Sequence, residues 1–271
     1  RRDKSHSDFR GSADYGYCAA RRLKYFGYKL VMLTTLNGTP YSFDLVPANT
    51  DEREAADEIL DTLKERETRF VYVNGHGETT LVKGWDTVCR RMIEDRFALG
   101  IVTNFARALN QTEIETLARF RRICVSCDTV DAELFSALRR KARLSVLLEN
   151  MERIRSYCLE SGIEQPVFSW SCVVSNKNVL DLTSLVRTGM EKGVTHFEYC
   201  NMTKYDDLPD TLNVYHISSM DTERMIRSRE SILASVQIAE ENGCVVSIQA
   251  GLLDVLEQRI AEANGPSHKT D

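Results

Sequence analysis

Apolar and polar positions follow a regular alternation from residue 70 onward. Short apolar runs rich in β-branched and aromatic residues alternate with longer segments whose apolar positions repeat with a helical period. The runs predict strands at 70–73, 98–103, 122–127, 167–174, 195–200, 213–217 and 244–249, and the longer segments predict helices at 81–95, 111–119, 131–138, 144–161, 179–192, 221–242 and 252–262. Such alternation indicates right-handed crossovers and a mainly parallel sheet, which is either a barrel or an open doubly wound sheet.

The first fifty residues have a different pattern, that of an antiparallel β-hairpin. Residues 25–35 and 41–46 read as two strands, and the Asn37-Gly38 pair between them is favoured in tight hairpin turns. Residues 51–67 read as a charged helix. We therefore expect an N-terminal hairpin unit at 1–50, an α/β unit at 51–262 and a polar tail at 263–271.

Polar residues follow four of the predicted parallel strands. They are Gly75, His76, Gly77 and Glu78 after strand 70–73, Asn104 after 98–103, Ser126 and Asp128 at the end of 122–127, and Asn176 after 167–174. Each alone fits a turn residue or a helix cap. Because the carboxyl ends of parallel strands meet at one edge of a sheet, the four together favour a shared polar site. Arg139 lies beyond Asp128, either facing a carboxylate or at a solvated helix end.

The composition is that of an ordinary globular protein, with 42% hydrophobic and 28% charged residues. The net charge of -5 gives no general attraction to nucleic acid or to an anionic membrane. No apolar run approaches the roughly 20 residues of a transmembrane helix. Because no secretory signal is visible, we expect the eight cysteines to be reduced thiols in the cytoplasm.

Several familiar site motifs are missing from the sequence. It contains no nucleophile elbow, no P-loop and no dinucleotide-binding glycine motif after a first strand. Cys124 and Cys127 lie three residues apart in a predicted strand, so they point to opposite faces and are expected to be two packed thiols. His76 has no partners at metal-ligand spacing. We therefore predict no metal ligand and no catalytic residue.

Four strand-end motifs occur in a fixed order between residues 52 and 255. They are G-H-G-E-T-T-L at 75–81, V-T-N at 102–104, V-S-C-D-T at 125–129 with Arg139 beyond it, and V-V-S-N at 173–176. In this order they resemble the strand ends of the radical S-adenosylmethionine (SAM) enzymes. The resemblance implies a partial (β/α)6 TIM-like barrel that binds SAM. It places the amino group of SAM at Gly75–Glu78, with Asn104 on the next strand. It places the ribose and carboxylate near Ser126, Asp128 and Arg139, and the adenine along Asn176.

The chain departs from that family at the iron–sulfur cluster. The family holds a [4Fe–4S] cluster on a C-x-x-x-C-x-x-C loop before the glycine motif, and such clusters need thiolate ligands. Upstream of Gly75 this chain has a single cysteine, Cys18. The cluster ligands are therefore absent, and we expect the reductive cleavage of SAM, which is the reaction of the parent family, to be lost.

Three motifs in the first fifty residues point elsewhere. They are A-D-Y-G-Y-C-A-A at 13–20, Y-F-G-Y-K-L at 25–30 and L-V-P-A-N-T-D at 45–51. They resemble the hairpin between the first two catalytic aspartates of an insertion-sequence DDE transposase, which has an RNase H-like fold. The first of those aspartates would precede residue 1, and the second would fall where the radical SAM pattern has begun. No transposase catalytic residue is assigned.

The two resemblances lead to three hypotheses. The first is a chimera, in which a transposase fragment has replaced the start of a radical SAM-type protein, which is inactive as written. The second is a non-catalytic barrel with SAM as its small-molecule partner. The third is a transposase fragment that acts on DNA through the basic stretch 1–29. In each case the hairpin at 25–46 either covers an exposed barrel edge or forms a separate flap.

Overall fold

The computed structural model describes residue 9 and residues 11–18, 23–34, 40–50, 70–74, 77–140, 142–202 and 215–264. The chain divides into two compact units. One consists of residues 1–71 and 90–97, and the other of residues 72–89 and 98–271. Each unit is described by itself. The predicted turn at Asn37-Gly38, the predicted helix at 51–67 and the residues Gly75 and His76 lie outside the described residues.

The first unit contains a three-stranded antiparallel sheet. Its strands are β1 (Asp14–Cys18), β2 (Leu23–Thr34) and β3 (Pro40–Pro47), in the order β1-β2-β3. Strands β2 and β3 confirm the predicted hairpin. Strand β1 was not predicted, because its five residues lie in a basic stretch without a clear period. A glycine is required at Gly16, since a Cβ there would lie 2.7 Å from the Cβ of Ala48.

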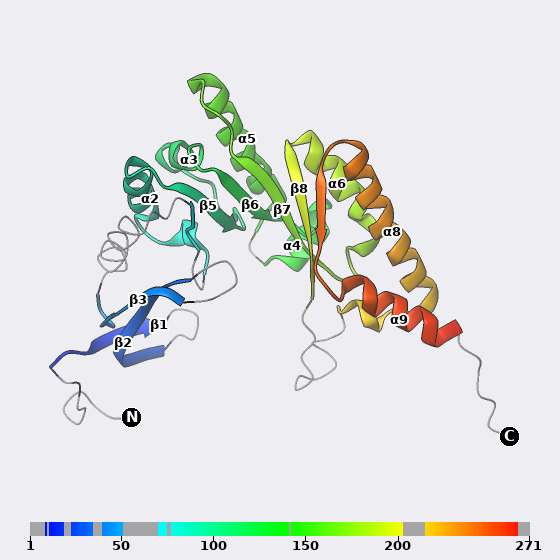
Figure 1. Ribbon diagram of the computed structural model, residues 1–271, viewed down its shortest axis with the longest axis horizontal. Helices are drawn as coiled ribbons and strands as arrows, with labels where there is room; N and C mark the ends of the chain where they lie inside the picture. Colours follow the sequence, from blue (N-terminus) through cyan, green and yellow to red (C-terminus); the bar gives the residue numbers. More distant parts are fainter. Residues whose placement is uncertain are drawn as a thin grey trace. The chain divides into compact units, whose positions relative to one another are not determined.

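The six remaining strands form a parallel sheet (Figure 1). They are β4 (Phe70–Tyr72), β5 (Ala98–Thr103), β6 (Arg122–Ser126), β7 (Val167–Val174), β8 (Val194–Asn201) and β9 (Val245–Ile248). They lie side by side in chain order, β4-β5-β6-β7-β8-β9. A doubly wound sheet reverses its strand order at a switch point. The described order contains no reversal, so the doubly wound alternative is wrong.

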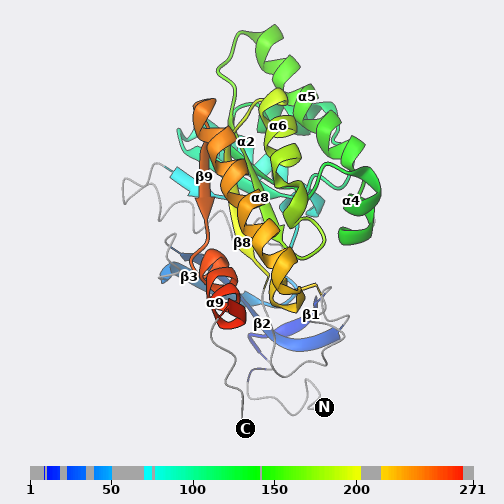
Figure 2. The same ribbon diagram turned by 90° about the vertical axis from the view of Figure 1, so that its right-hand side faces the viewer.

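Seven described helices accompany the strands. They are α2 (Trp85–Glu94), α3 (Gln111–Leu117), α4 (Ala132–Leu138), α5 (Leu144–Ser161), α6 (Leu182–Glu191), α8 (Thr222–Glu241) and α9 (Leu252–Asn264). Helices α6 and α8 pack on each other and on the strands β8 and β9, and α9 packs on α8 (Figures 1 and 2). Asn110, Asp131 and Asp221 cap the helices α3, α4 and α8 with their side chains, which explains where these helices begin.

Two predicted elements end up differently in the structure. The predicted strand 213–217 is wrong over its described residues, because Ile217 begins the short 3-10 helix η4 (Ile217–Ser219). The His216 side chain accepts the Ser218 amide and so turns the backbone there. The helix predicted from residue 81 begins only at Trp85, because Gly84 adopts a left-handed φ of 78° that interrupts it.

The core lies between the parallel sheet and its helices. In β7 the side chains of Phe168, Trp170, Cys172 and Val174 are buried, whereas Ser169 and Ser171 on the opposite face are only half-buried. This strict alternation is why the bounds of β7 were predicted correctly. Among the described residues, no helix has both the length and the apolar character needed to cross a membrane.

Candidate ligand site at the ends of β4, β5 and β6

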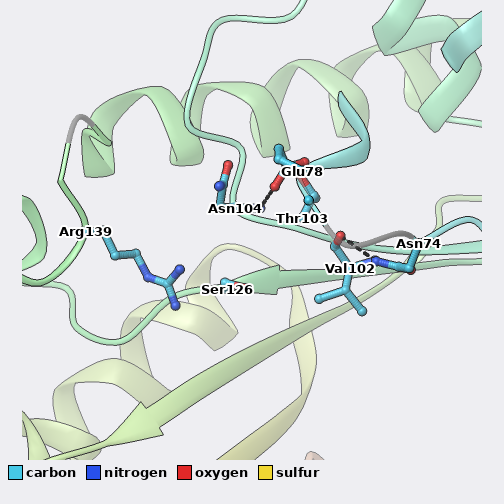
Figure 3. Close-up of a pocket in the computed structure, with 8 residues that line it drawn as sticks. Asn74, Glu78, Val102, Thr103, Asn104, Ser126 and Arg139 are labelled. Atoms are coloured by element: carbon cyan, nitrogen blue, oxygen red, sulfur yellow. Dashed lines mark hydrogen bonds between the residues drawn. The ribbon is translucent and has the colours of Figure 1, made fainter. Parts of the chain in front are cut away.

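A pocket of about 270 Å³ opens where the strands β4, β5 and β6 end (Figure 3). Figure 3 shows Arg139 on one side of it and Asn74 on the other, with Ser126 on the strand between them. The lining residues are Asn74, Gly77, Glu78, Val102, Thr103, Asn104, Ser126 and Arg139. The pocket volume is just below the range for small-molecule sites, which is about 300–1,000 Å³.

Glu78 is the negatively charged group of this pocket. Its Oε1 accepts the Thr80 hydroxyl at 2.8 Å, the Thr80 amide at 3.3 Å and the Thr103 hydroxyl at 2.6 Å. Its Oε2 accepts the Asn104 amide at 2.8 Å (Figure 3). These bonds come from the 3-10 helix η2 (Thr79–Leu81), which Glu78 caps, and from the end of β5. They fix the carboxylate and leave acceptor capacity on Oε2.

The loop after β5 is held in a strained shape next to Glu78. Phe105 has a φ of 44° although it is a bulky residue, and it is only 1% exposed. Its amide donates to the Thr103 hydroxyl at 3.2 Å. The buried Asn150 of α5 donates to Arg107 O at 2.7 Å and accepts the Leu109 amide at 3.1 Å. Strained backbone of this kind costs about 1–3 kcal/mol and concentrates at functional sites.

An ion pair between the half-buried Arg107 and the buried Glu113 lies behind the pocket. Arg107 Nη1 donates to Glu113 Oε2 at 2.8 Å, and Arg107 Nη2 donates to Glu113 Oε1. Glu113 also accepts the Asn110 amide at 2.8 Å and the Trp85 indole at 3.2 Å. Burial raises the pKa of the Glu113 carboxyl, but the bonds from Arg107, Asn110 and Trp85 outweigh it and lower that pKa below its ordinary value. The bond to Glu113 chiefly raises the pKa of Arg107.

A second ion pair fixes the cation of the pocket. Arg139 Nε lies 2.7 Å from Asp128 Oδ2, without the alignment of a hydrogen bond. Asp128 Oδ1 accepts the Val173 amide at 2.9 Å, and Asn178 Nδ2 donates to Asp128 O at 2.7 Å. Asp128 and Asn178 are both buried. The arginine is therefore tethered to the ends of β6 and β7 while it lines the pocket.

The structure brings most of the predicted site residues together. The described ones that line the pocket are Gly77, Glu78, Asn104, Ser126 and Arg139, and Asp128 joins them through Arg139. Sequence reasoning left three other lining residues, Asn74, Val102 and Thr103, out of the site. Thr103 carried a recognisable signal, because it stands in the V-T-N strand end. Asn74 carried no such signal. Its place in the pocket follows from two hydrogen bonds between its side chain and the backbone of Val102, which stand in place of a β-ladder.

Asn176 lies apart from the lining residues. Its amide donates to Tyr215 O at 3.0 Å, its Nδ2 donates to Ser219 Oγ at 2.8 Å, and its carbonyl accepts Arg224 Nη2 at 2.6 Å. These bonds join the end of β7 to residues 215–224. A role for Asn176 at the adenine of SAM remains a prediction.

The cysteines are spread along the chain. Those whose side chains the structure describes are free thiols, namely Cys89, Cys124, Cys127, Cys158, Cys172, Cys200 and Cys244. Burial raises the pKa of Cys124 to about 11 and that of Cys127 to about 12. Both are packed thiols, as expected. Within the described ranges, no three His, Cys, Asp or Glu side chains form a group that could hold a metal ion.

The solved structures with a similar fold include radical SAM enzymes. Streptococcus suis SuiB bound to precursor peptide SuiA is 17% identical, with a TM-score of 0.54 over 91% of this chain and 50% of that one. SuiB bound to S-adenosylmethionine gives 17% identity and a TM-score of 0.53 over 79% and 45%. Native anSMEcpe with bound AdoMet gives 16% and 0.50 over 71% and 54%. At these identities the likeness shows the fold alone, and the chain spans about half the length of these structures.

A family model matches the N-terminal third of the chain. The transposase DDE domain matches residues 3–88, which is less than half of the chain. The match extends past the boundary predicted near residue 50 and includes the glycine motif at 75–78. A comparison with curated proteins found no match.

Proposed function

We propose that residues 51–262 form a radical SAM-type partial (β/α)6 barrel that binds S-adenosylmethionine without cleaving it. The fold likeness supports the barrel, as does a parallel sheet whose strands follow chain order. The observation that carries the proposal is the pairing of charges in one pocket. Glu78 and Arg139 both line it, and each is fixed by bonds from its own side of the site.

The pocket residues fit the amino-acid end of SAM, which carries an ammonium and a carboxylate. Glu78 Oε2 accepts one described hydrogen bond, from Asn104, and so would hold the ammonium. Arg139 would hold the carboxylate through guanidinium donors that its contact with Asp128 does not use. When bound, SAM supplies the sulfonium carbon–sulfur bond whose reductive cleavage is the reaction of the parent family. The residues of this chain bind and orient it.

The cysteines do not fit a [4Fe–4S] cluster. Cys18 is the single cysteine before Gly75, and no loop of the described chain carries three cysteines. Cluster ligands are thiolates, and burial raises the pKa of Cys124 and Cys127, which pack as neutral thiols in the core. We therefore assign this chain no step of SAM cleavage. The proposed activity is ligand binding.

Isothermal titration calorimetry with SAM and with S-adenosylhomocysteine tests the proposal. Both ligands keep the amino-acid end, so both are expected to bind. Glu78→Gln removes the negative charge and is expected to weaken binding about 10- to 100-fold, the effect of one hydrogen bond between charged groups. Glu160→Gln on the exposed end of α5 is the matched control and should change nothing. A wild-type chain that binds neither ligand would show that the proposal is wrong.

Reconstitution with iron and sulfide tests the proposed inactivity. We expect no stable visible absorbance of an iron–sulfur cluster and no cleavage of SAM under reducing conditions. A stable cluster that supports cleavage would contradict the argument from the cysteines.

The chimera is the part of the proposal that concerns origin. A transposase fragment at 1–50 would precede the barrel at 51–262 and the tail at 263–271. Sequencing the DNA around codon 50 in an independent isolate tests this. An uninterrupted radical SAM reading frame without the transposase segment would support a chance join of two genes. The same join in unrelated isolates would indicate a natural gene fusion.

The transposase match favours a second candidate function, which is DNA binding. The basic stretch 1–29 would contact phosphates, so affinity should fall as salt rises. A truncation that starts at residue 52 separates the candidates. It should lose DNA affinity if the N-terminal segment binds DNA, and it should keep SAM affinity if the barrel carries the pocket.

A further inference from the structure

The short helix η2, which Glu78 caps, is held from behind by one arginine. Arg107 Nε donates to Thr80 O at 3.1 Å, and Arg107 Nη2 donates to the same carbonyl. The amide and hydroxyl of Thr80 in turn donate to Glu78 Oε1. Thr80 therefore connects the guanidinium of Arg107 to the carboxylate of Glu78.

The Thr80 carbonyl depends on this arginine. Inside η2 the backbone bonds run from Leu81 N to Glu78 O and from Val82 N to Thr79 O. In the described part of the chain, no backbone amide donates to Thr80 O. Since Thr80 is only 1% exposed, water is a poor substitute there. Arg107 thus supplies the donors that a buried carbonyl of this turn requires.

Glu113 fixes the arginine in its place. It binds Arg107 through both carboxylate oxygens, it is 5% exposed, and it is itself held by the capping box with Asn110 and by the Trp85 indole. The planar guanidinium can meet a carboxylate and a carbonyl at once, which a lysine cannot do with the same geometry. Three elements, η2, α2 and α3, are joined in this way behind the pocket.

We propose that Arg107, held by Glu113, is a positioning residue that sets the orientation of Glu78 for ligand binding. The inference rests on the proposed function for its ligand. The effect of Arg107 on η2 does not depend on that ligand, and it can be measured in the ligand-free chain.

Hydrogen exchange of the ligand-free chain is the first part of the test. Arg107→Met is expected to speed amide exchange about tenfold in residues 77–84, which corresponds to about 1.4 kcal/mol of lost protection. Exchange in the core strand β7 should not change. Arg107→Lys keeps one donor for Thr80 O and should restore part of the protection. The control is Arg153→Met, because Arg153 donates to Leu109 O at 2.5 Å in the same loop but does not contact η2.

Calorimetry with SAM is the second part. Arg107→Met should weaken SAM binding about tenfold and Arg153→Met should not. The inference is overturned if residues 77–84 exchange as slowly in Arg107→Met as in the wild type, or if Arg153→Met exposes them equally. If the wild type binds no SAM, the proposed function fails, and the exchange result still decides the role of Arg107.

A third variant keeps the test valid if Arg107→Met folds poorly, because that substitution leaves the buried Glu113 without its partner. The double variant Arg107→Met/Glu113→Gln removes that uncompensated charge and keeps an acceptor for Trp85. It should fold and show the same fast exchange in residues 77–84. A double variant with wild-type protection there would also overturn the inference.

Discussion

Removing one hydroxyl group measures how firmly the Glu78 carboxylate is held. Thr103→Val keeps the shape of the side chain and deletes a hydroxyl with two bonds. That hydroxyl donates to Glu78 Oε1 at 2.6 Å and accepts the Phe105 amide at 3.2 Å. Because Thr103 is 1% exposed, water cannot readily replace either bond.

The expected cost follows from these two bonds. A hydrogen bond to a charged group contributes about 1.5–3 kcal/mol, and a buried donor left without a partner costs about 1–3 kcal/mol. The bond from the Phe105 amide is long, so the free-energy cost of losing it is at the low end of this range. We expect Thr103→Val to lower the free energy of unfolding by about 3 kcal/mol.

Urea unfolding followed by circular dichroism provides the measurement, with the midpoint shifting and the m-value unchanged. Thr116→Val is the matched control, because Thr116 is also fully buried and its hydroxyl donates to Thr112 O at 2.7 Å within α3. That bond is neutral, and its loss should cost about 1 kcal/mol. Equal losses in the two variants would refute the idea that the bond from Thr103 to the Glu78 carboxylate contributes more than a neutral bond.

Three further predictions concern other parts of the second unit. Because the folded pKa of Glu113 is lowered, its contribution to stability is fully present above its ordinary pKa of about 4.3 and is lost as the pH falls toward the folded value. The difference in unfolding free energy between wild type and Glu113→Gln should therefore be constant near neutral pH and shrink in acid. Asn150→Ala should cost about 3 kcal/mol in urea unfolding, because it leaves buried backbone groups of the loop after β5 without partners. A maleimide should label the half-buried Cys200 in the native protein, and the buried Cys127 only after unfolding, as peptide mass mapping would show.

Each of these has a clear contrary result. A stability difference between wild type and Glu113→Gln that grows in acid would contradict a lowered pKa of Glu113 in the folded state. Asn242→Ala is the control for Asn150→Ala, because Asn242 makes one exposed bond to Ile238 O, and equal losses in the two would contradict the role of burial. Native labelling of Cys127 at the rate of Cys200 would contradict its packing.

Most regular elements of the parallel sheet and its helices could be predicted from local pattern. Strand β7 alternates strictly, and α5 runs as one amphipathic segment until Gly162 ends it with a left-handed φ of 65°. The polar strand ends also predicted much of the pocket, because parallel strands place their carboxyl ends at one edge. Glu78 and Asn104, far apart in sequence, are joined there by a hydrogen bond.

Contacts between distant segments could not be predicted in this way. Glu113 follows Asn110 at capping-box spacing, which locally explains it without Arg107 or Trp85. In sequence Asn176 looks like the other strand-end residues, but in the structure its side chain and its carbonyl are hydrogen-bonded to residues within 215–224. The curvature of the sheet and the domain boundary near residue 50 stay predictions.

The positive φ of Phe105 has a consequence for how the protein folds. A bulky residue keeps that conformation only while its surroundings impose it. Those surroundings include Asn150 on α5, whose Nδ2 lies 3.5 Å from Phe105 O across 45 residues of chain. The loop beside Glu78 can therefore take its shape only after α5 has docked. In a refolding experiment, the SAM binding proposed above should therefore appear after the helical signal, and it would report the folding of the second unit alone.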